Sequence, residues 1–226
     1  MTHARATRPL PLALTTLIAT FAALVALAAS GGRDAHAHDS AASAEISRSE
    51  LALRQGMRVL WEDHVTWTRL AVISLTTDAP DTNATVSRLL RNQTEIGNAI
   101  KPYYGNAAGQ ALTRLLREHI TIAADLIAAA KAADGEKVAS AQASWQRNAH
   151  RIAGLLSKAN PNAWKLGEMK AMLRTHLGLT TQEVVARLNR KWAADVRNYD
   201  AIHRQALGMA DMLSDGIVEQ FPARFR

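Results

Sequence analysis

Histidine is the residue type of this chain with the most evident capacity for chemistry, since neutral imidazole is the commonest protein ligand for metal ions outside thiolates. The chain has 226 residues, 8 histidines and no cysteine. Several histidines stand in the middle of apolar residues spaced three and four apart, the pattern of a buried helix face. These are His64, His119, His176 and His203. Because an unpartnered buried imidazole costs on the order of 1–3 kcal/mol, we expect each to have a partner inside the fold.

Carboxylates near these histidines indicate what the partners could be. Asp200 precedes His203 by three positions, which puts both side chains on one helix face, as in the carboxylate–histidine metal sites of helical bundles. Glu62, Glu118 and Glu183 could act as further ligands or as acceptors that orient an imidazole. The sequence therefore predicts an interior His/carboxylate site for a transition-metal ion (Zn, Fe or Cu), with haem as the second choice. Its first-rank ligands are His64, His119 and His176, and its second-rank ligands are Glu183 and His203.

Other interpretations of the same residues stay open. Each histidine could be a core residue hydrogen-bonded to a neighbour, and the protein would then be a structural or partner-binding envelope protein without a cofactor. A third interpretation is an enzyme that uses a His/carboxylate centre for redox chemistry or hydrolysis. Arg69 and Arg187 could bind an anionic ligand, or could form ion pairs at the rim of the core. Metal binding for storage, sensing or redox is the preferred interpretation.

The motifs of several enzyme classes are missing from the sequence. It contains no glycine-rich phosphate loop, no G-x-S-x-G, no H-E-x-x-H and no C-x-x-C-H haem attachment. The formal net charge is +7, with acidic residues spread among the basic ones and no Lys/Arg run interleaved with aromatic residues. This pattern argues against a nucleic-acid partner. No motif supports a particular reaction, and the sequence names no partner.

The first residues have the pattern of an export signal. Arg5 and Arg8 precede an apolar run over 10–29, and Ala35-His36-Ala37 offers a small-x-small cleavage site. We predict a signal peptide over 1–37, a flexible lead-in over 38–46 and a periplasmic or extracellular location. The run of about 20 residues is also long enough to span a bilayer, so membrane anchoring is expected only if it is not cleaved. Cleavage after Ala37 would let His38 offer an amine and an imidazole to copper.

Helical periodicity and helix-breaking residues predict the rest of the fold. Ser47 and Glu50 have the spacing of a capping box at the start of a helix, and Pro102, Pro161 and Gly178 are expected to end later ones. A single domain over 47–222 follows, with helices expected over 47–77, 82–100, 104–133, 136–158, 164–177 and 180–220. Because four of these are long and their connections are short, the fold class predicted is all-α, an antiparallel four-helix bundle with additional short helices.

The same residues form a pattern that resembles an uncharacterised bacterial family of small exported helical proteins. The pattern covers about residues 50–222 and consists of Trp61-Glu62-x-His64-x-x-Trp67-Thr68-Arg69, Arg88-Leu89-Leu90-x-Asn92, Pro102-Tyr103-Tyr104-Gly105, His119, Met172-x-x-His176-Leu177, Glu183, Met209-Ala210-Asp211 and Gln220-Phe221-Pro222. Automatic labels such as glycosyltransferase or acetylglutamate kinase have been attached to members, and no residue here supports either label. The resemblance implies no activity, substrate or cofactor. It supports His203 less than the other histidines, since related sequences sometimes carry another residue there.

Overall fold

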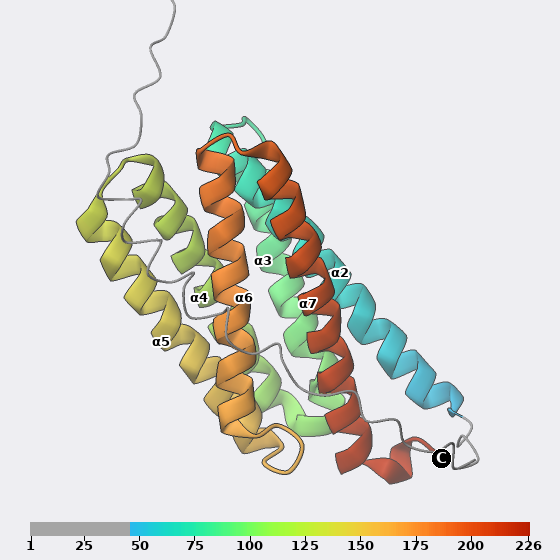
Figure 1. The fold of residues 1–226 in the computed structure, drawn as a ribbon. Helices are drawn as coiled ribbons and strands as arrows, with labels where there is room; N and C mark the ends of the chain where they lie inside the picture. Colours follow the sequence, from blue (N-terminus) through green and yellow to red (C-terminus); the bar gives the residue numbers. More distant parts are fainter. Residues whose placement is uncertain (1–45) are drawn as a thin grey trace, which may run out of the picture.

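The computed structural model describes residues 46–226, and this part of the chain is all-helical, as predicted. Six α-helices are followed by a short 3-10 turn (Figure 1). They are α2 (Arg48–Thr77), α3 (Thr82–Ala99), α4 (Lys101–Lys131), α5 (Gly135–Ala159), α6 (Leu166–Leu188), α7 (Trp192–Gln220) and η1 (Pro222–Arg224). The predicted signal segment, and all of the lead-in before Ile46, lie outside the described residues.

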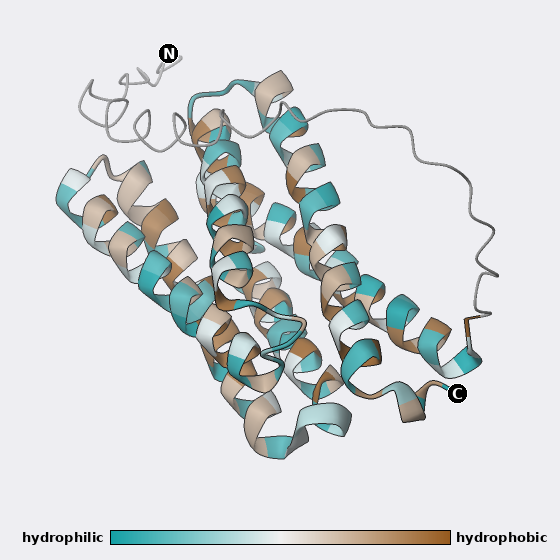
Figure 2. Ribbon diagram, turned by 60° about the horizontal axis from the view of Figure 1, so that its bottom comes forward, coloured by the Kyte–Doolittle hydropathy of each residue, from teal (hydrophilic) through white to brown (hydrophobic). Residues whose placement is uncertain are grey.

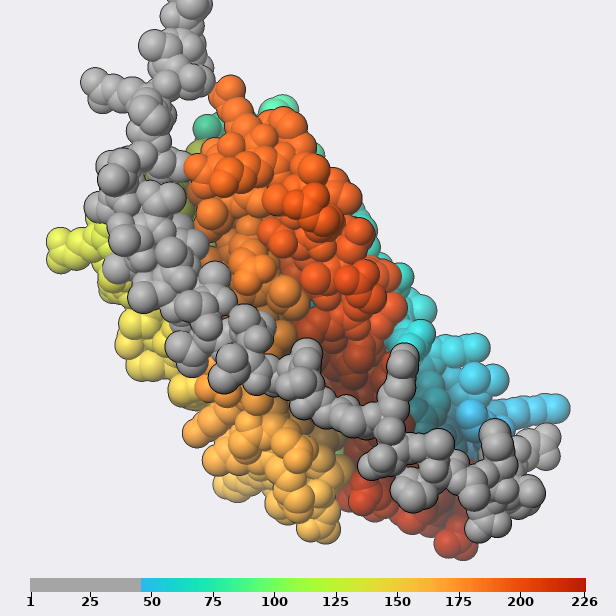
Figure 3. Space-filling model, in the orientation of Figure 1, coloured from blue at the N-terminus to red at the C-terminus, as the bar shows by residue number. Residues whose placement is uncertain are grey.

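The helices form a closed ring in which each packs against the next and α7 packs back against α2. Short connections make neighbouring helices antiparallel, because a short loop can only return the chain along the element that it has just left. Figure 1 shows α2 and α7 running side by side, and Figure 3 shows α6 and α7 together on one face of the molecule. All of these helices have 18 to 31 residues, whereas the sequence predicted four long helices and shorter pieces.

The predicted break at Gly178 is wrong. Helix α6 runs through Gly178 to Leu188, and the chain reverses over 189–191, where Arg190 adopts a left-handed backbone with φ 57°. A new helix was expected to begin at Thr180, but the hydroxyls of Thr180 and Thr181 donate to the carbonyl oxygens of His176 and Leu177 one turn earlier. A hydroxyl that bonds back in this way stays inside a helix. The predicted helix over 180–220 is therefore two helices.

Glycines set the close packing of α3 against α4. A Cβ at Gly97 would lie 2.7 Å from the carbonyl oxygen of Gly109 and 2.0 Å from Oγ1 of Thr113. The two helices approach each other more closely than any side chain there would permit. The turn between them is made by Lys101-Pro102 and by Gly105, whose φ of 79° interrupts the first turns of α4.

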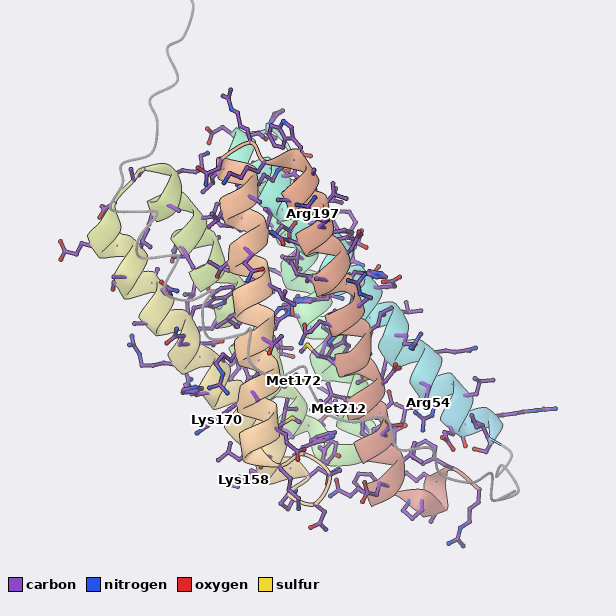
Figure 4. All side chains as sticks on the ribbon, in the orientation of Figure 1. Arg54, Lys158, Lys170, Met172, Arg197 and Met212 are labelled. Carbon is purple, nitrogen blue, oxygen red and sulfur yellow. The ribbon has the colours of Figure 1, made fainter. Side chains whose placement is uncertain are left out.

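The core fills the inside of the ring, and the hydrophobic faces of the helices turn toward it (Figure 2). Its largest side chains come from widely separated parts of the chain and include Met57, Trp61, Trp145, Ile152, Trp164, Met169 and Ile217. Basic side chains such as Lys158, Lys170 and Arg197 lie along the outer surfaces of α5, α6 and α7 (Figure 4). Within residues 46–226, no helix combines the length and the apolar character that a bilayer span requires.

Candidate functional site

Histidines from three alternate helices of the ring meet in its interior. His64 lies on α2, His119 on α4 and His176 on α6. The ring centre of His176 is 6.0 Å from that of His64 and 6.2 Å from that of His119. His119 and His176 are buried, and His64 is partly buried. The structure therefore brings together the three first-rank histidines, with His176 in contact with both of the others, and we call them the histidine cluster.

Amide side chains hold two of these imidazoles by their Nδ1 atoms. His119 Nδ1–H donates to Oδ1 of Asn148 on α5 at 2.9 Å, and His176 Nδ1–H donates to Oε1 of Gln205 on α7 at 3.0 Å. The amide of Asn148 is itself fixed, because its Nδ2 donates to the carbonyl oxygen of Leu115 at 3.0 Å. A neutral imidazole that donates from Nδ1 keeps its lone pair on Nε2. Both rings are thus held in the tautomer that can bind a metal through Nε2.

The third imidazole has the opposite arrangement. Gln93 Nε2 donates to Nδ1 of His64 at 3.2 Å, and the same amide nitrogen lies 2.8 Å from the carbonyl oxygen of Leu89 and 3.0 Å from Oδ1 of Asn92. An imidazole that accepts at Nδ1 carries its proton on Nε2. Oε1 of Gln93 is buried and has no hydrogen-bond partner among residues 46–226. His64 therefore lies beside an unsatisfied carbonyl oxygen.

The electrostatics of the cluster favour neutral rings. Burial, followed by the neighbouring imidazoles, lowers the pKa of His64 to about 3, and burial together with His176 lowers the pKa of His119 to about 3. Burial also lowers the pKa of His176, against the raising effect of the hydrogen bond that its Nδ1–H donates to Gln205. All three are uncharged at neutral pH, which is the form that binds metal ions.

The surroundings of the cluster are largely apolar. The ring of Trp145 lies 5.1 Å from that of His119, centre to centre, and its Nε1 has no hydrogen-bond partner among residues 46–226. An apolar crevice of about 50 Å³, lined by Trp145 and Thr180 among others, lies between α4, α5 and α6. A larger surface groove of about 540 Å³ lies between α4 and α5, and none of the histidines lines it. No histidine of the cluster lines the crevice either.

Glu183 is not part of the cluster, although the sequence analysis proposed it as a ligand. Its Oε1 accepts from Nη1 of Arg69 at 2.6 Å, and Arg69 also pairs with both carboxylate oxygens of Asp195. Arg187 Nη1 donates to Oδ2 of Asp195 at 2.9 Å. Glu183 and Asp195 are fully buried, so two arginines and two acids form a closed network between α2, α6 and α7. Arg69 and Arg187 therefore form ion pairs with these two acids.

The acids of this network respond differently to it. Burial raises the pKa of Glu183 against the lowering effect of Arg69. Burial would also raise the pKa of Asp195, but hydrogen bonds and charge from Arg69 and Arg187 outweigh it, and the pKa falls below its usual value. The hydrogen bond to Asp195 is the largest of the effects that raise the pKa of Arg69. Asp195 is therefore the charged acid that forms ion pairs with both Arg69 and Arg187.

The remaining predicted site residues lie near the surface. His203 Nε2 forms a pair with Oε2 of Glu62 at 2.6 Å, between α7 and α2, and both side chains are partly exposed. Glu118 pairs with Arg151 at 2.8 Å, and Asp200 is exposed. His203 is thus placed in a surface pair with Glu62 and not in the histidine cluster.

Some important residues were missed because their helix faces were assigned wrongly or because amides give a weak signal. In one continuous helix over 180–220, the apolar spacing would turn Trp192 and Val196 inward. They are instead 53% and 52% exposed, while Asp195 between them is buried. The break over 189–191 rotates the start of α7 relative to the face predicted for one continuous helix. Gln93 and Gln205 are neutral, so no charge pattern marks them. The sequence marks Gln93 and Gln205 as interior only through their position beside apolar residues on the same helix face.

The cluster as it stands is not a preformed metal site, since residues 46–226 contain no group of three or more His, Asp or Glu in metal-binding arrangement. Its rings lie slightly too far apart and His64 carries its proton on Nε2, while the neutrality of the rings and the tautomers of His119 and His176 suit a ligand set. No family model, curated protein or solved structure matches this chain.

Proposed function

We propose that this protein is an exported helical bundle that binds one transition-metal ion through Nε2 of His64, His119 and His176. The observation that carries the proposal is the way Asn148 and Gln205 hold the Nδ1 atoms of His119 and His176, which leaves Nε2 as the free nitrogen of each ring. Partners on the non-ligating nitrogen orient metal-binding histidines and raise their basicity. Export rests on the basic residues and apolar run of the N-terminal segment.

A modest inward movement of the rings would complete the site. With metal–nitrogen bonds of about 2.0–2.1 Å, ring centres around a shared ion lie roughly 5–5.5 Å apart for trigonal or tetrahedral binding. The distances of 6.0 and 6.2 Å in the cluster exceed this range by less than about 1 Å. Side chains on helices can move by this amount through small changes of their χ angles. Metal binding would then draw together rings that are already neighbours.

His64 must also change tautomer to act as a ligand through Nε2. Its ring proton would move to Nδ1, and a half-turn of the Gln93 amide would bring Oε1 to accept it. The half-turn would break the bonds that Gln93 Nε2 donates to the carbonyl oxygen of Leu89 and to Oδ1 of Asn92, so metal binding must offset their loss. This change would give all three imidazoles the same arrangement, with an amide oxygen at Nδ1 and a metal at Nε2.

The chemistry of the site favours binding, for storage or sensing, over turnover. The crevice beside it holds about 50 Å³, too little for haem and for most organic substrates. Glu183, the nearest candidate for a general base on α6, is engaged by Arg69. Zn, Fe and Cu remain the ions to test.

A cofactor-free structural or partner-binding envelope protein is the alternative. The observation that favours it is that residues 46–226 hold no metal-ready group, while every Nδ1 atom of the cluster already has a partner. In that case the histidines would serve only to fill and specify the core.

Metal titration of the purified protein separates the two. We expect one equivalent of metal to bind, to survive gel filtration and to be lost in His176→Ala. The exposed His150→Ala is the matched control and should bind as the wild type does. Circular dichroism would show that each variant stays folded. If metal binding persists in folded His176→Ala, or if none of the three metals binds to the wild type, the cofactor-free alternative is favoured.

A further inference from the structure

We infer that the histidine cluster selects monovalent copper, Cu(I), over divalent ions such as Zn(II). The inference rests on the proposed function, since it concerns the same site. It draws on three observations: the charge around the cluster, the distances between its rings, and the number of ligands that the interior offers.

The partners of the cluster carry no charge. The Nδ1 atoms contact the side-chain amides of Gln93, Asn148 and Gln205, and the imidazoles themselves are neutral ligands. Glu183, the buried acid that follows His176 on α6, is already paired with Arg69 at 2.6 Å. A bound ion would therefore keep its full charge in the interior. Because the cost of moving an ion out of water rises with the square of its charge, a divalent ion would cost about four times as much as a monovalent one of similar size.

The ring distances favour wide angles at the metal, because wide angles require the smaller inward movement. For metal–nitrogen bonds of about 2.0–2.1 Å, ring centres lie roughly 5.2 Å apart at a tetrahedral angle, 5.5 Å at a trigonal angle and 6.3 Å when two rings lie opposite each other. The two measured separations are 6.0 and 6.2 Å. Reaching the trigonal distance therefore takes an inward movement of about 0.5–0.7 Å, against about 0.8–1.0 Å for the tetrahedral distance. Three-coordinate binding, which closed-shell Cu(I) accepts, needs the smaller rearrangement. Zinc takes four ligands in a tetrahedral arrangement.

The interior offers a Zn(II) ion no further ligand among the contacts of the cluster. His119 packs against the ring of Trp145, and the crevice beside that ring is lined mainly by alanine, leucine, isoleucine and valine. A three-histidine zinc site completes its shell with water or hydroxide, which itself needs hydrogen-bond partners. Imidazole binds copper as well as zinc, so the ligand type does not oppose the selection. Charge, angle and ligand number all favour the monovalent ion.

Competition titrations of the full chain test the inference. Cu(I) would be titrated without oxygen, in excess reductant, against bathocuproine disulfonate, and Zn(II) against a colorimetric zinc chelator. His3→Asn, His36→Asn and His38→Asn would be present throughout to remove copper binding by the N-terminal segment. We expect Cu(I) to bind at least about a hundredfold more tightly than Zn(II). His176→Ala should lose Cu(I) binding.

The outcomes distinguish this inference from the proposed function. Zn(II) that binds as tightly as Cu(I), in a manner that depends on His176, would overturn the selectivity and leave the metal site in place. If neither ion binds in a manner that depends on His176, both proposals fail. Ag(I), a monovalent ion that needs no reductant, should compete with Cu(I) for the same single site.

A charge variant tests the stated cause of the selectivity. Gln205→Glu keeps an oxygen at Nδ1 of His176, gives up only a long 3.4 Å bond to the carbonyl oxygen of Met172, and adds a negative charge beside the site. We expect the Cu(I)-to-Zn(II) affinity ratio to fall by about tenfold or more, because a divalent ion gains twice as much from the added charge. Gln110→Glu, an exposed position on α4, is the matched control and should leave the ratio unchanged. A ratio that Gln205→Glu does not lower would overturn the inference.

Discussion

Asn148 and Gln205 do for His119 and His176 what a carboxylate does at many metal-binding histidines, but without adding charge. An amide oxygen fixes the tautomer and the plane of the ring, and it leaves the imidazole less basic than a carboxylate would. Burial lowers the pKa of both rings against the raising effect of these hydrogen bonds, to about 3 for His119, so both are neutral at pH 7. His119 and His176 therefore carry a lone pair, and not a proton, on Nε2.

The depressed pKa values predict that acid destabilises the fold well before the carboxylates titrate. His64 and His119 have pKa values of about 3 in the folded protein against 6.5 as the reference value. Since the unfolded chain takes up these protons first, the stabilisation is complete above pH 6.5 and is lost as pH falls from 6.5 toward 3. Each histidine contributes up to about 1.4 kcal/mol per pH unit in that window. Urea unfolding at a series of pH values measures it.

The control is a histidine that lies outside the cluster. His119→Gln should flatten the dependence of the unfolding free energy on pH between 6.5 and 4.5, whereas His150→Gln, at an exposed position of α5, should not. An equal slope in both variants and in the wild type would show that the buried imidazoles are not the groups that titrate.

Asn148 is predicted to be among the most sensitive polar residues of the core. Asn148→Leu removes the acceptor of His119 Nδ1–H and the donor to the carbonyl oxygen of Leu115, leaving both buried and unpaired. We expect a loss of about 2–4 kcal/mol in the free energy of unfolding. Asn98→Ala, at an exposed position of α3, should change it by less than about 0.5 kcal/mol. Similar midpoints in urea for the two variants would refute the role given to Asn148.

At the scale of the elements, the glycines of α3 and α4 decide how closely two antiparallel helices pack. Gly97 and Gly109 face each other across the contact, and each backbone lies where the other's Cβ would be. This packing holds α3 against the ring, and α3 supplies Gln93 to His64. The position of one cluster partner therefore depends on a backbone contact about one helical turn away along α3.

Alanine substitutions at two glycines should act in opposite directions. Gly97→Ala forces a Cβ against Gly109 and Thr113, and we expect a loss of about 1–3 kcal/mol in stability. Gly154→Ala, at a position of α5 where a Cβ would meet nothing within 4 Å, should gain up to about 1 kcal/mol because alanine favours the helix. Thermal and urea unfolding of the two variants measure both effects. A Gly97→Ala protein as stable as the wild type would contradict the close contact.

For the molecule as a whole, a line of charge pairs joins the last helix to the first. Arg54 pairs with Asp215 and Arg58 with Asp211 near one end, Glu62 pairs with His203, and Arg69 pairs with Asp195 toward the other end. The order of these pairs follows from the antiparallel arrangement of α2 and α7. The outer pairs are exposed and contribute little, whereas the Arg69 network is buried and must stay complete.

Breaking the buried network should be costly. Arg69→Met leaves Glu183 and Asp195 buried without their main cation, and we expect a loss of about 3 kcal/mol, at the lower end of the range because the Arg69 side chain is 16% exposed. Arg58→Met removes an exposed pair with Asp211 and is the matched control, for which we expect little change. Urea unfolding at pH 7 compares them, and equal losses in the two variants would contradict the distinction.

Much of the fold follows from local signals in the sequence. Ser47 caps α2 by accepting from the backbone N–H of Glu50, as the capping box predicts, and apolar periodicity locates the buried faces of α2, α4 and α5. Placing histidines on those faces was possible because the periodicity of one helix is a local property. The break over 189–191 was not predicted, because no proline or glycine marks it and the left-handed residue is Arg190.

The site could be predicted only in part, for a related reason. Which helices adjoin in a ring depends on the whole chain, so the sequence could place His64, His119 and His176 inside but not name Gln93, Asn148 and Gln205 as their hydrogen-bond partners. Glu183 looked available as a ligand because the sequence did not pair it with Arg69, and Asp195, the other acid that Arg69 binds, lies beside Val196, which the apolar spacing turned inward. Because the wrong face was assigned to the start of α7, the ion-pair network of Glu183 was missed and Glu183 was wrongly proposed as a ligand.

The ¹⁵N spectrum of the histidine rings during a titration with Cu(I) tests the central claim most directly, since it reports the tautomer and the ligation of each imidazole. We predict that the Nε2 signals of His64, His119 and His176 shift together and stop changing at one equivalent, while those of His150 and His203 stay where they were. Before metal is added, His119 and His176 should carry their protons on Nδ1 and His64 on Nε2. Shifts confined to histidines outside the cluster, or no shift within it, would contradict the account.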